Sequence, residues 1–332
     1  MQIINKGLKV LVTGGAGFIG SNFIRHILTK YEDYHIVNLD SLTYCGNLGN
    51  LADIEKNKRY QFIKGDITDA KTVERIVKDC DVIVNFAAET HVDRSIKDPS
   101  IFVKTNVFGT YTLLEAAKKF GTKLYIQIST DEVYGSVPQG HSKEGDPLMP
   151  NSPYSASKAS GDLLARSYFI TYKVPVIITR SSNNFGPYQY PEKVIPLFIT
   201  NLLQDKKVPV YADGMNMRDW LYVVDNCEAI DLVIHKGEPG DIYNIGAGCE
   251  TKNIDLTKAI LALLGKDDSM IEYVKDRPGH DKRYALDIAK LKGLGWRPRR
   301  DFKYALELTI EWYKNNNAWW QKLAKCRTEI KY

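Results

Sequence analysis

Short apolar runs alternate with helical patterns through the first half of the 332-residue chain, and this alternation constrains the fold more than any other feature. Each run is apolar for four to six residues, which is typical of strands buried on both faces. Such strands are expected to be parallel, because right-handed crossovers place the intervening helices on both faces of one sheet. Strands are predicted at residues 9–12, 35–39, 60–64, 82–86, 124–129 and 176–180, and helices at 17–31, 70–79, 101–120 and 152–172.

The alternation stops after residue 180, where residues 181–190 are rich in Asn, Gly, Pro and Tyr and are expected to form a loop. We therefore expect an α/β, doubly wound parallel sheet with a smaller C-terminal lobe that closes over the carboxyl edge of the sheet. The sheet would comprise residues 1–180 with a return segment at about 219–245, and the lobe residues 181–218 and 246–332. Further helices are predicted at 195–203, 223–235, 254–264, 287–294 and 301–315, and strands at 208–211 and 242–245.

The composition is that of an ordinary globular protein, with 44% hydrophobic and 26% charged residues. The cysteines Cys45, Cys80, Cys227, Cys249 and Cys326 are scattered without a C-x-x-C pair, so neither a disulfide framework nor a metal site is expected. No apolar stretch approaches about 18 residues, so we expect a cytoplasmic protein with no membrane partner. The net charge of +5 does not by itself indicate a nucleic-acid partner.

A glycine-rich turn follows the first predicted strand directly and opens a helix, with Gly14, Gly17 and Gly20 at its key positions. Glycines there permit a tight turn, close approach of the backbone to a pyrophosphate and close packing of the helix. Asp40 ends the second strand twenty residues after Gly20, where a carboxylate accepts hydrogen bonds from a ribose diol and repels a 2′-phosphate. This context predicts a Rossmann-type site for NAD rather than NADP. The alternative is a turn in which the glycines serve packing only.

A Tyr and a Lys four residues apart, Tyr154 and Lys158, lie on one face of the predicted helix 152–172. A Tyr hydroxyl, with an ordinary pKa of about 10, is a poor base at neutral pH unless cations stabilise its phenolate. Lys158 supplies one positive charge and the nicotinamide ring of NAD⁺ another, while Thr130 ends the fifth strand and would hydrogen-bond the reacting oxygen. The three residues predict oxidation of a sugar hydroxyl. Taken alone, a Tyr and a Lys at this spacing are also common on solvated helices.

Together these motifs resemble the extended short-chain dehydrogenase/reductase family and, within it, the dTDP-glucose 4,6-dehydratases. The resemblance covers nearly the whole chain and implies a nucleotide-sugar substrate. Most members of the superfamily carry small or neutral residues where this chain has Asp131 and Glu132, so this acidic pair is the discriminating signal. The segments that carry the resemblance are residues 14–21, 42–47, 87–95, 129–135, 183–196, 218–220 and 276–284.

The resemblance implies a role for each matching residue. Catalytic roles fall on Thr130, Asp131, Glu132, Tyr154 and Lys158. Cofactor-binding roles fall on Gly14, Gly17, Phe18, Ile19, Gly20, Asp40, Ser41, Leu42, Thr43, Asp66, Ile67, Ala87, Ala88, Thr105, Tyr154, Lys158 and Asn184. Substrate-binding roles fall on Thr90, Thr130, Glu132, Asn183, Lys193, Val194, Pro209, Tyr211, Arg218, Asn253, Arg277 and His280.

The acidic pair has a specific use in a dehydration. Once C4 of a hexose is a ketone, the C5 proton is acidic and the C6 hydroxyl lies β to the carbonyl. Glu132 would remove the C5 proton, and Asp131 would protonate the departing hydroxyl. Neighbouring carboxyls in a closed site have pKa values that are pushed apart, which suits one base and one acid. The expected reaction converts dTDP-glucose to dTDP-4-keto-6-deoxyglucose and water, with NAD regenerated.

Several alternatives stay open at this point. The substrate could be UDP-glucose rather than dTDP-glucose, because no single residue here distinguishes the two nucleotides. The enzyme could also be a nucleotide-sugar 4-epimerase, which would share Tyr154, Lys158 and NAD but would not eliminate water. Arg218 and Arg277 are equally compatible with surface ion pairs. A non-catalytic NAD-sensing or RNA-binding protein on the same fold is the alternative from another class. The resemblance also implies a homodimer that packs the helices 101–120 and 152–172 of two copies together.

Overall fold

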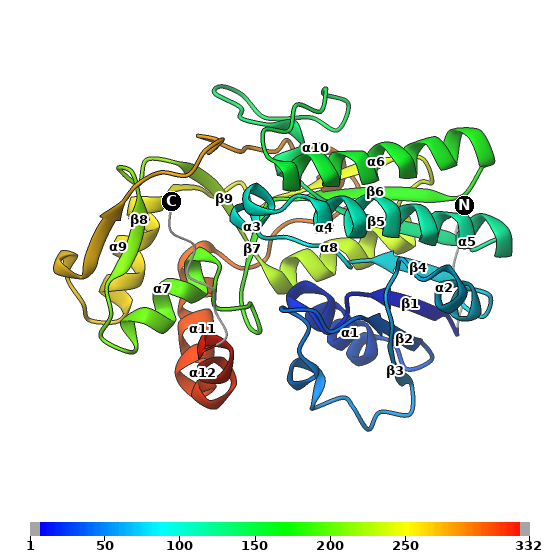
Figure 1. Cartoon of the computed structure of the whole chain (residues 1–332), viewed down its shortest axis with the longest axis horizontal. Coiled ribbons are helices and arrows are strands. Elements are labelled where there is room, and N and C mark those ends of the chain that lie inside the picture. The colour runs from blue at the N-terminus through cyan, green and yellow to red at the C-terminus, as the bar shows by residue number, and fades with distance from the viewer. Residues whose placement is uncertain (1–6, 326–332) are drawn as a thin grey trace.

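The computed structural model describes residues 7–325, and its centre is a seven-stranded sheet in which every neighbouring pair is parallel (Figure 1). The strand order β10-β6-β5-β4-β1-β2-β3 confirms the predicted doubly wound sheet. The order reverses between β1 and β4, which marks the place where ligands bind in such sheets. The strands are β1 (Lys9–Thr13), β2 (His35–Asp40), β3 (Tyr60–Lys64), β4 (Val82–Asn85), β5 (Leu124–Thr130), β6 (Val176–Ser181) and β10 (Ile242–Ile245).

Helices cover both faces of this sheet, because successive residues of each buried strand point to opposite faces. Val10 and Val12 of β1 pack with Phe23 in one core, whereas Leu11 packs with Leu113 in the other. Figure 1 shows α5 and α6 on one face and α1 on the other. The first core includes residues of α1 (Phe18–Lys30) and α8 (Val223–Lys236), and the second includes residues of α2 (Ala70–Val77), α5 (Thr110–Phe120) and α6 (Pro153–Tyr172).

The predicted helix at 101–120 is instead three consecutive pieces: α4 (Ser100–Phe102), a π-helical segment η2 (Val103–Gly109) and α5. The Asn106 side chain accepts a hydrogen bond from Glu89 N at 2.9 Å and donates one to Glu89 O at 3.0 Å. It also donates to the Ser157 hydroxyl at 2.8 Å. The wider π-helical turn thus occurs where the Asn106 side chain is hydrogen-bonded to two other segments. Such π-helical turns are frequent at functional sites.

The segments after β6 form two small sheets, of order β11-β9-β7 and β12-β8, with helices packed around them. The expected loop at 181–190 is partly wrong, because it contains β7 (Asn183–Phe185), which pairs with β9 (Met217–Tyr222). The predicted helix at 287–294 is only α10 (Ala289–Gly293). The remaining elements are η1 (Leu48–Leu51), α3 (Val92–Lys97), η3 (Asp131–Tyr134), α7 (Val194–Leu202), β8 (Val208–Tyr211), β11 (Glu250–Lys252), α9 (Asn253–Leu263), η4 (Asp268–Met270), β12 (Ile271–Val274), α11 (Phe302–Asn315) and α12 (Asn317–Lys325).

Within residues 7–325, no helix is long and apolar enough to cross a membrane. The cysteines Cys45, Cys80, Cys227 and Cys249 are free thiols, and Cys326 lies outside the described residues. The same part of the chain contains no group of three His, Cys, Asp or Glu side chains placed to hold a metal ion.

A buried carboxylate, Asp231 of α8, joins α8 to α1 on one face of the sheet. Its Oδ2 contacts His26 Nε2 at 2.9 Å and Lys30 Nζ at 2.5 Å, and its Oδ1 accepts from the Tyr31 hydroxyl at 2.9 Å. His235 Nδ1 lies 3.0 Å from the same Oδ1. Burial alone would raise the pKa of Asp231, but hydrogen bonds from His235, His26 and Lys30 outweigh it and hold that pKa well below its ordinary value.

This cluster predicts a pH-dependent stability. Burial would lower the pKa of His235, but its hydrogen bonds to Asp231 raise it. The stability from protonated His235 is therefore fully present below its unfolded pKa of about 6.5 and is lost as pH rises through the higher folded pKa. We expect the difference in free energy of unfolding between wild type and His235→Gln, measured by urea titration, to shrink from about pH 6 to about pH 9. A difference that stays constant with pH would contradict this account.

Candidate functional site

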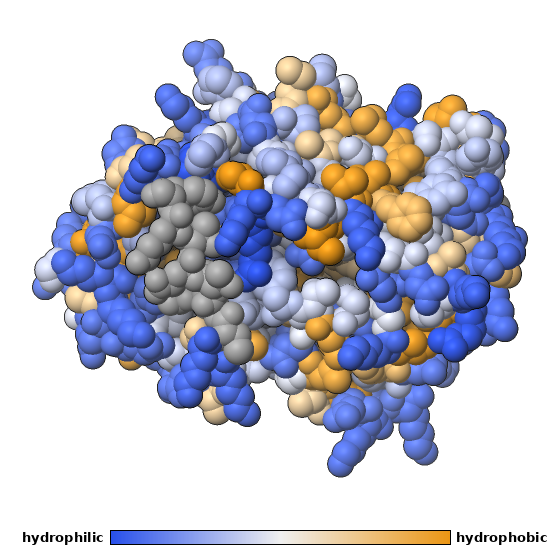
Figure 2. Space-filling model, in the orientation of Figure 1, coloured by the Kyte–Doolittle hydropathy of each residue, from blue (hydrophilic) through white to orange (hydrophobic). Residues whose placement is uncertain are grey.

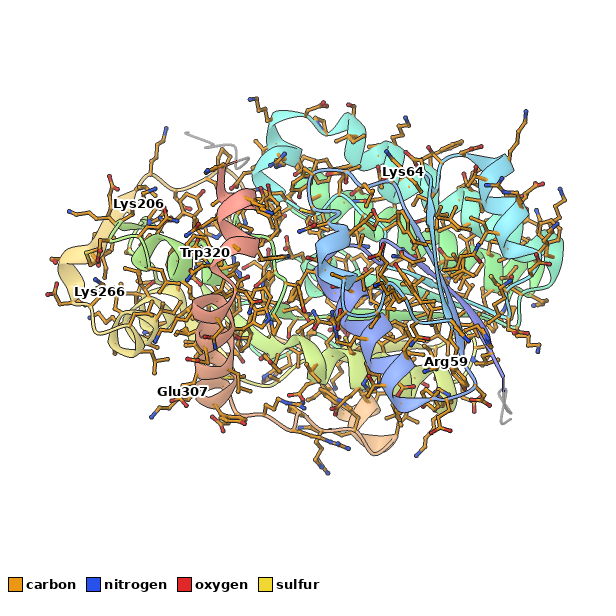
Figure 3. The ribbon with its side chains drawn as sticks, turned by 90° about the horizontal axis from the view of Figure 1, so that it is seen from below. Arg59, Lys64, Lys206, Lys266, Glu307 and Trp320 are labelled. Carbon is orange, nitrogen blue, oxygen red and sulfur yellow. The ribbon has the colours of Figure 1, made fainter. Side chains whose placement is uncertain are left out.

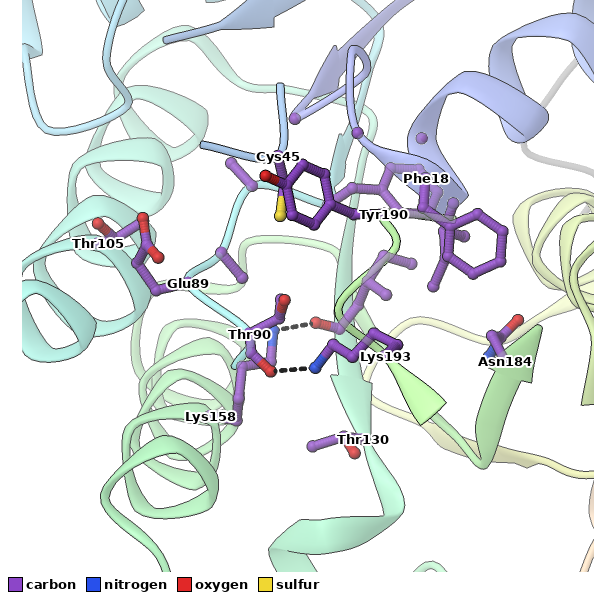
Figure 4. Close-up of a pocket in the computed structure, with 18 of the residues that line it drawn as sticks. Phe18, Cys45, Glu89, Thr90, Thr105, Thr130, Lys158, Asn184, Tyr190 and Lys193 are labelled. Carbon is purple, nitrogen blue, oxygen red and sulfur yellow. Dashed lines mark hydrogen bonds between the residues drawn. The ribbon is translucent and has the colours of Figure 1, made fainter. Parts of the chain in front are cut away.

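A cavity of about 340 Å³ opens at the carboxyl ends of the central strands and extends toward the lobe (Figure 4). It brings together most of the residues that the sequence predicts for cofactor and reaction. Because the strands are parallel, their carboxyl ends share one edge, and the turns that follow them meet there. Of the predicted residues, the cavity is lined by Gly14, Gly17, Phe18, Ile19, Gly20, Asp40, Ser41, Thr43, Asp66, Ile67, Ala87, Ala88, Thr90, Thr105, Thr130, Asp131, Glu132, Tyr154, Lys158, Asn183, Asn184, Lys193 and Val194.

The turn between β1 and α1 requires glycine at two positions. Gly14 has a φ of +69°, and a Cβ there would lie 2.7 Å from the backbone nitrogen of Ala87. A Cβ on Gly20 would lie 2.5 Å from the carbonyl oxygen of Gly14. The turn and the start of α1 therefore pack closer together than any side chain permits. This leaves a concave backbone surface at a helix N-terminus, which is suited to a phosphate group.

Asp40 ends β2 beside this turn, where it is 7% exposed. Its Oδ2 accepts a hydrogen bond from Ala16 N at 2.9 Å, and its Oδ1 accepts one from Leu42 N at 2.8 Å. Burial raises the pKa of Asp40, and the two backbone donors oppose that rise. The carboxylate is thus locked in orientation against the glycine turn. Leu42 does not line the cavity; its backbone serves Asp40 instead.

The acidic pair sits on the short helix η3 that follows β5. Thr130 caps this helix: its Oγ1 accepts from Glu132 N at 3.3 Å and donates to Asp131 Oδ1 at 3.1 Å. Asp131 Oδ2 is buried without a hydrogen-bond partner. Burial, reinforced by the charge of Glu132, raises the pKa of Asp131 well above its ordinary value. An Asp in these surroundings favours its protonated form, which can donate a proton.

Glu132 lies in a different electrostatic environment. Burial raises its pKa, but the positive charges of Arg277, Lys193 and Arg218 oppose the rise. The surroundings of the two carboxyls therefore differ: the largest charge effect on the pKa of Asp131 comes from the anion Glu132, whereas the largest on the pKa of Glu132 comes from the cation Arg277. Such a difference suits one acid and one base in the same site.

Tyr154 and Lys158 enter the site from the first turns of α6. Ser152 begins this helix with a capping box, and Tyr154 N donates to the Ser95 hydroxyl at 3.1 Å. Lys158 Nζ donates to the carbonyl oxygen of Ile128 at 2.6 Å, and burial lowers the pKa of this lysine to about 8. Burial and the charge of Glu132 raise the pKa of Tyr154. The protein alone therefore disfavours a phenolate, and a further positive charge beside Tyr154 is needed to form one.

Lys193 lies beside the segment that follows β4, where its Nζ donates to the carbonyl oxygen of Thr90 at 2.7 Å (Figure 4). Figure 4 also shows Lys158 and Thr130 on one side of the cavity and Asn184 on the other. The cavity wall thus combines segments that follow β4, β5, β6 and β7.

The other predicted substrate residues do not line this cavity. Two of them lie beside Asp93 of α3: its Oδ2 accepts from the Tyr211 hydroxyl at 3.4 Å, and its Oδ1 lies 3.8 Å from Arg277 Nε. Arg218 donates to the carbonyl oxygen of Asp281 at 2.9 Å. One guanidinium nitrogen of Arg277 is buried without a hydrogen-bond partner. The predicted residues outside the cavity lining are Leu42, Pro209, Tyr211, Arg218, Asn253, Arg277 and His280.

Sequence reasoning missed several residues that line the cavity. Glu89 and Glu192 are the most notable, because each brings a further carboxyl group into the site. Burial raises the pKa of Glu89, and Glu192 forms an ion pair with Arg94 at 3.0 Å. Both lie in segments that carry the family resemblance, so that signal pointed to them. The other missed lining residues with polar side chains or sulfur are Cys45, Ser129, Ser181, Ser182, Gln189, Tyr190 and Trp220.

This fold and site define the class: a doubly wound sheet with a glycine turn, an Asp ending β2, and a Tyr–Lys pair beside a Thr, as in the extended short-chain dehydrogenases/reductases. The chain belongs to the family described as GDP-mannose 4,6 dehydratase, whose family model matches residues 11–309.

Individual relatives confirm the resemblance seen in the sequence. The dTDP-glucose 4,6-dehydratase of Streptomyces antibioticus is 51% identical over 324 residues, covering 96% of each chain. The low-salt glycan biosynthesis protein Agl12 of Haloferax volcanii is 52% identical over 306 residues, which cover 92% of this chain and 98% of that one. The crystal structure of DesIV, a dTDP-glucose 4,6-dehydratase from Streptomyces venezuelae with NAD and TYD bound, superposes with a TM-score of 0.93 at 50% identity. It covers 95% of this chain and 100% of that chain.

Proposed function

We propose that the chain is an NAD-dependent 4,6-dehydratase that converts dTDP-glucose to dTDP-4-keto-6-deoxyglucose and water. The observation that carries this proposal is the acidic pair, of which Asp131 is buried and Glu132 half-buried. The pair directly follows Thr130 and lines the same cavity as Tyr154. An alcohol oxidation needs the Thr and the Tyr, whereas an elimination needs an acid and a base in addition. A 4-epimerase has no use for the acidic pair, so the pair favours dehydration.

NAD fits the residues at the switch point of the sheet. The close approach of Gly14 to Ala87 leaves backbone free to face a pyrophosphate, and Asp40 is oriented to accept from a ribose diol. When bound, NAD⁺ supplies a hydride acceptor and the positive charge that Tyr154 lacks. The proposed cofactor-binding part is residues 1–180 with the return segment 219–245, and the proposed nucleotide-sugar part is 181–218 and 246–332; residues 1–6 and 326–332 lie outside the described structure.

The proposed reaction uses the chain's own groups in sequence. Tyr154, with Lys158 and Thr130 nearby, removes the proton from the C4 hydroxyl of the hexose as that carbon is oxidised. Glu132 then removes the C5 proton, which the C4 ketone has made acidic. Asp131, held protonated by its surroundings, donates its proton to the departing C6 hydroxyl, and water leaves.

The nucleotide diphosphate is assigned to the cationic side of the site. Lys193, Arg218 and Arg277 all influence Glu132 electrostatically, so they lie close to the reaction centre. Arg218 and Arg277 carry guanidinium groups that donate in pairs to phosphate oxygens. The unpartnered nitrogen of Arg277 is a donor that such a diphosphate would satisfy. We place the reaction in the cytoplasm, which agrees with the free thiols of the described cysteines.

Turnover of candidate sugars tests this function. We expect purified protein to convert dTDP-glucose to a product lighter by one water, with no added reductant, because the hydride taken from C4 returns to C6. Mass spectrometry of the products from dTDP-glucose, UDP-glucose and GDP-mannose checks the result. Net 4-epimerisation without loss of water would refute the proposal. Faster dehydration of UDP-glucose would show that the nucleotide of the substrate carries uracil rather than thymine.

Two isosteric variants test the roles of the acidic pair. Glu132→Gln keeps the shape but cannot accept the C5 proton, so NADH should form in a single turnover without solvent deuterium entering at C5. Asp131→Asn should retain oxidation and C5 exchange but eliminate the C6 hydroxyl more slowly. We expect overall turnover to fall roughly 10²–10⁴-fold in each, as when a positioned acid or base is lost. If both variants stop at the same step, the division of labour is wrong.

We also infer that two copies pack through the exposed apolar face of η2, α5 and α6. Leu163 is 57% exposed, Ile170 51% and Tyr172 52% on α6, and Val103 and Phe108 of η2 are also exposed. Figure 2 shows hydrophobic surface over this region. A contiguous apolar face of this kind on a folded chain marks an interaction surface. A second copy is the proposed partner, because two such helix pairs can form a four-helix bundle.

A charge on this face should prevent that association. We expect wild type to sediment as a dimer and Leu163→Glu to sediment as a folded monomer in analytical ultracentrifugation. Met215→Glu, which places the same charge on a 47% exposed residue outside the face, is the control and should remain dimeric. A monomeric wild type at micromolar concentration would count against the inference.

A further inference from the structure

The C-terminal helix α12 contacts the part of the sheet that carries the glycine turn. In Figures 1 and 3, α12 lies on the side of the lobe that faces α1, and Figure 3 labels Trp320 on it. The neighbouring Trp319 donates from its indole Nε1 to Asn50 Oδ1 at 2.9 Å, across a separation of 269 residues. Asn50 belongs to η1, the short helix that follows β2. One hydrogen bond thus ties the end of the described chain to the beginning of the fold.

Asn50 also contacts the glycine turn, so it links Trp319 to that turn. It is 1% exposed, and its Nδ2 donates to the carbonyl oxygen of Ala16 at 2.9 Å. The indole nitrogen of Trp319 can only donate, and the carbonyl oxygen of Ala16 can only accept. The Asn50 amide must therefore turn its Oδ1 toward Trp319 and its Nδ2 toward Ala16. Without Trp319, the buried Oδ1 would lose its partner and the amide would lose its fixed orientation.

Ala16 lies inside the glycine turn between Gly14 and Gly20. Its carbonyl oxygen accepts from Asn50 and from Asn47 N at 3.0 Å, and its nitrogen donates to Asp40 Oδ2 at 2.9 Å. The position of this residue relative to Asp40 therefore depends on a support that reaches back to α12. Asp40, the acceptor of the Ala16 nitrogen, lines the cavity assigned to NAD.

A second set of contacts joins α11 to the segment around Gln189, another part of the cavity lining. Tyr188 lies between the guanidinium of Arg25, 4.6 Å from its ring centroid, and the ring of Trp312, 4.8 Å away. The Tyr313 hydroxyl donates to the carbonyl oxygen of Gln189, a residue that lines the cavity. The helices α11 and α12 therefore contact two segments that adjoin the same cavity.

We propose that α12 acts as a clasp on the dinucleotide turn, in which Trp319 and Asn50 are positioning residues that set how tightly NAD is held. This inference rests on the proposed function, because it takes NAD to be the ligand at the turn. Neither residue lines the cavity, so neither would contact the cofactor directly. The relay from Trp319 through Asn50 to Ala16 supports the turn whether or not sugar is present.

Removal of the indole donor tests the clasp. The ring of Trp319 also lies 6.0 Å from that of Tyr188 between centroids. Trp319→Phe keeps an aromatic ring at this position but cannot donate to Asn50. We expect the dissociation constant for NAD, from titration calorimetry, and the release rate of radiolabelled NAD to rise roughly 3- to 10-fold. A buried acceptor without its partner shifts an equilibrium by about tenfold or more, and part of that shift falls on NAD binding. Asn50→Ala should have a similar effect.

The matched control is Trp320→Phe, which removes an equivalent indole donor from the same helix. Trp320 Nε1 donates to the carbonyl oxygen of Tyr313 at 2.9 Å, so its loss leaves Asn50 untouched. We expect this variant to lower the melting temperature without changing NAD affinity. In the Asn50→Ala background, Trp319→Phe should cause no further loss of affinity, because both changes break the same relay.

Three results would overturn the clasp: unchanged NAD affinity in Trp319→Phe, equal loss in Trp319→Phe and Trp320→Phe, or additive losses in the double variant with Asn50→Ala. If the wild-type protein itself binds no NAD, the proposed function fails and this inference fails with it. Tight binding by wild type together with unchanged binding by Trp319→Phe would overturn the clasp alone.

Discussion

Burial of ionisable groups at the carboxyl edge of one parallel sheet is the constraint on which the rest of this structure depends. A charge removed from water is costly unless neighbouring groups stabilise it, and three of the buried groups here make hydrogen bonds that do so in part. Asp40 has two backbone donors, Asp131 has the Thr130 hydroxyl, and Lys158 has the Ile128 carbonyl. Burial raises the pKa values of Asp40 and Asp131 and lowers that of Lys158, so all three move closer to neutrality.

The lobe completes this arrangement by adding positive charge from other segments. Lys193 is the residue that caps the N-terminus of α7, Arg218 lies on β9, and Arg277 follows β12. Their combined charge opposes the effect of burial on Glu132, whereas the neighbouring Glu132 raises the pKa of Asp131. Two adjacent carboxyls thereby acquire different proton affinities, because their surroundings come from different parts of the chain.

The central sheet was predictable because each strand is a contiguous apolar run, and the structure places all seven strands within a residue or two of the predicted ranges. The strands β7, β9, β11 and β12 were missed. Three of these four span only three or four residues, and their pairing partners lie far away in the sequence. The π-helical segment Val103–Gly109 was missed for a related reason. The Asn106 side chain forms hydrogen bonds with Glu89 and Ser157, and the periodicity of a helix does not predict such distant contacts.

The sequence by itself determined the doubly wound sheet, the glycine turn with Asp40, and the contiguous motifs around Thr130 and Tyr154. These features depend on local spacing, since a strand end, a helix start and one helical turn each involve only a few neighbouring residues. The tertiary structure alone decided that Tyr211 and Arg277 gather around Asp93 rather than line the cavity, and that Trp319 meets Asn50. Such contacts join segments more than 100 residues apart in the sequence. They arise when one packed surface docks on another, and no local pattern of residues predicts that docking.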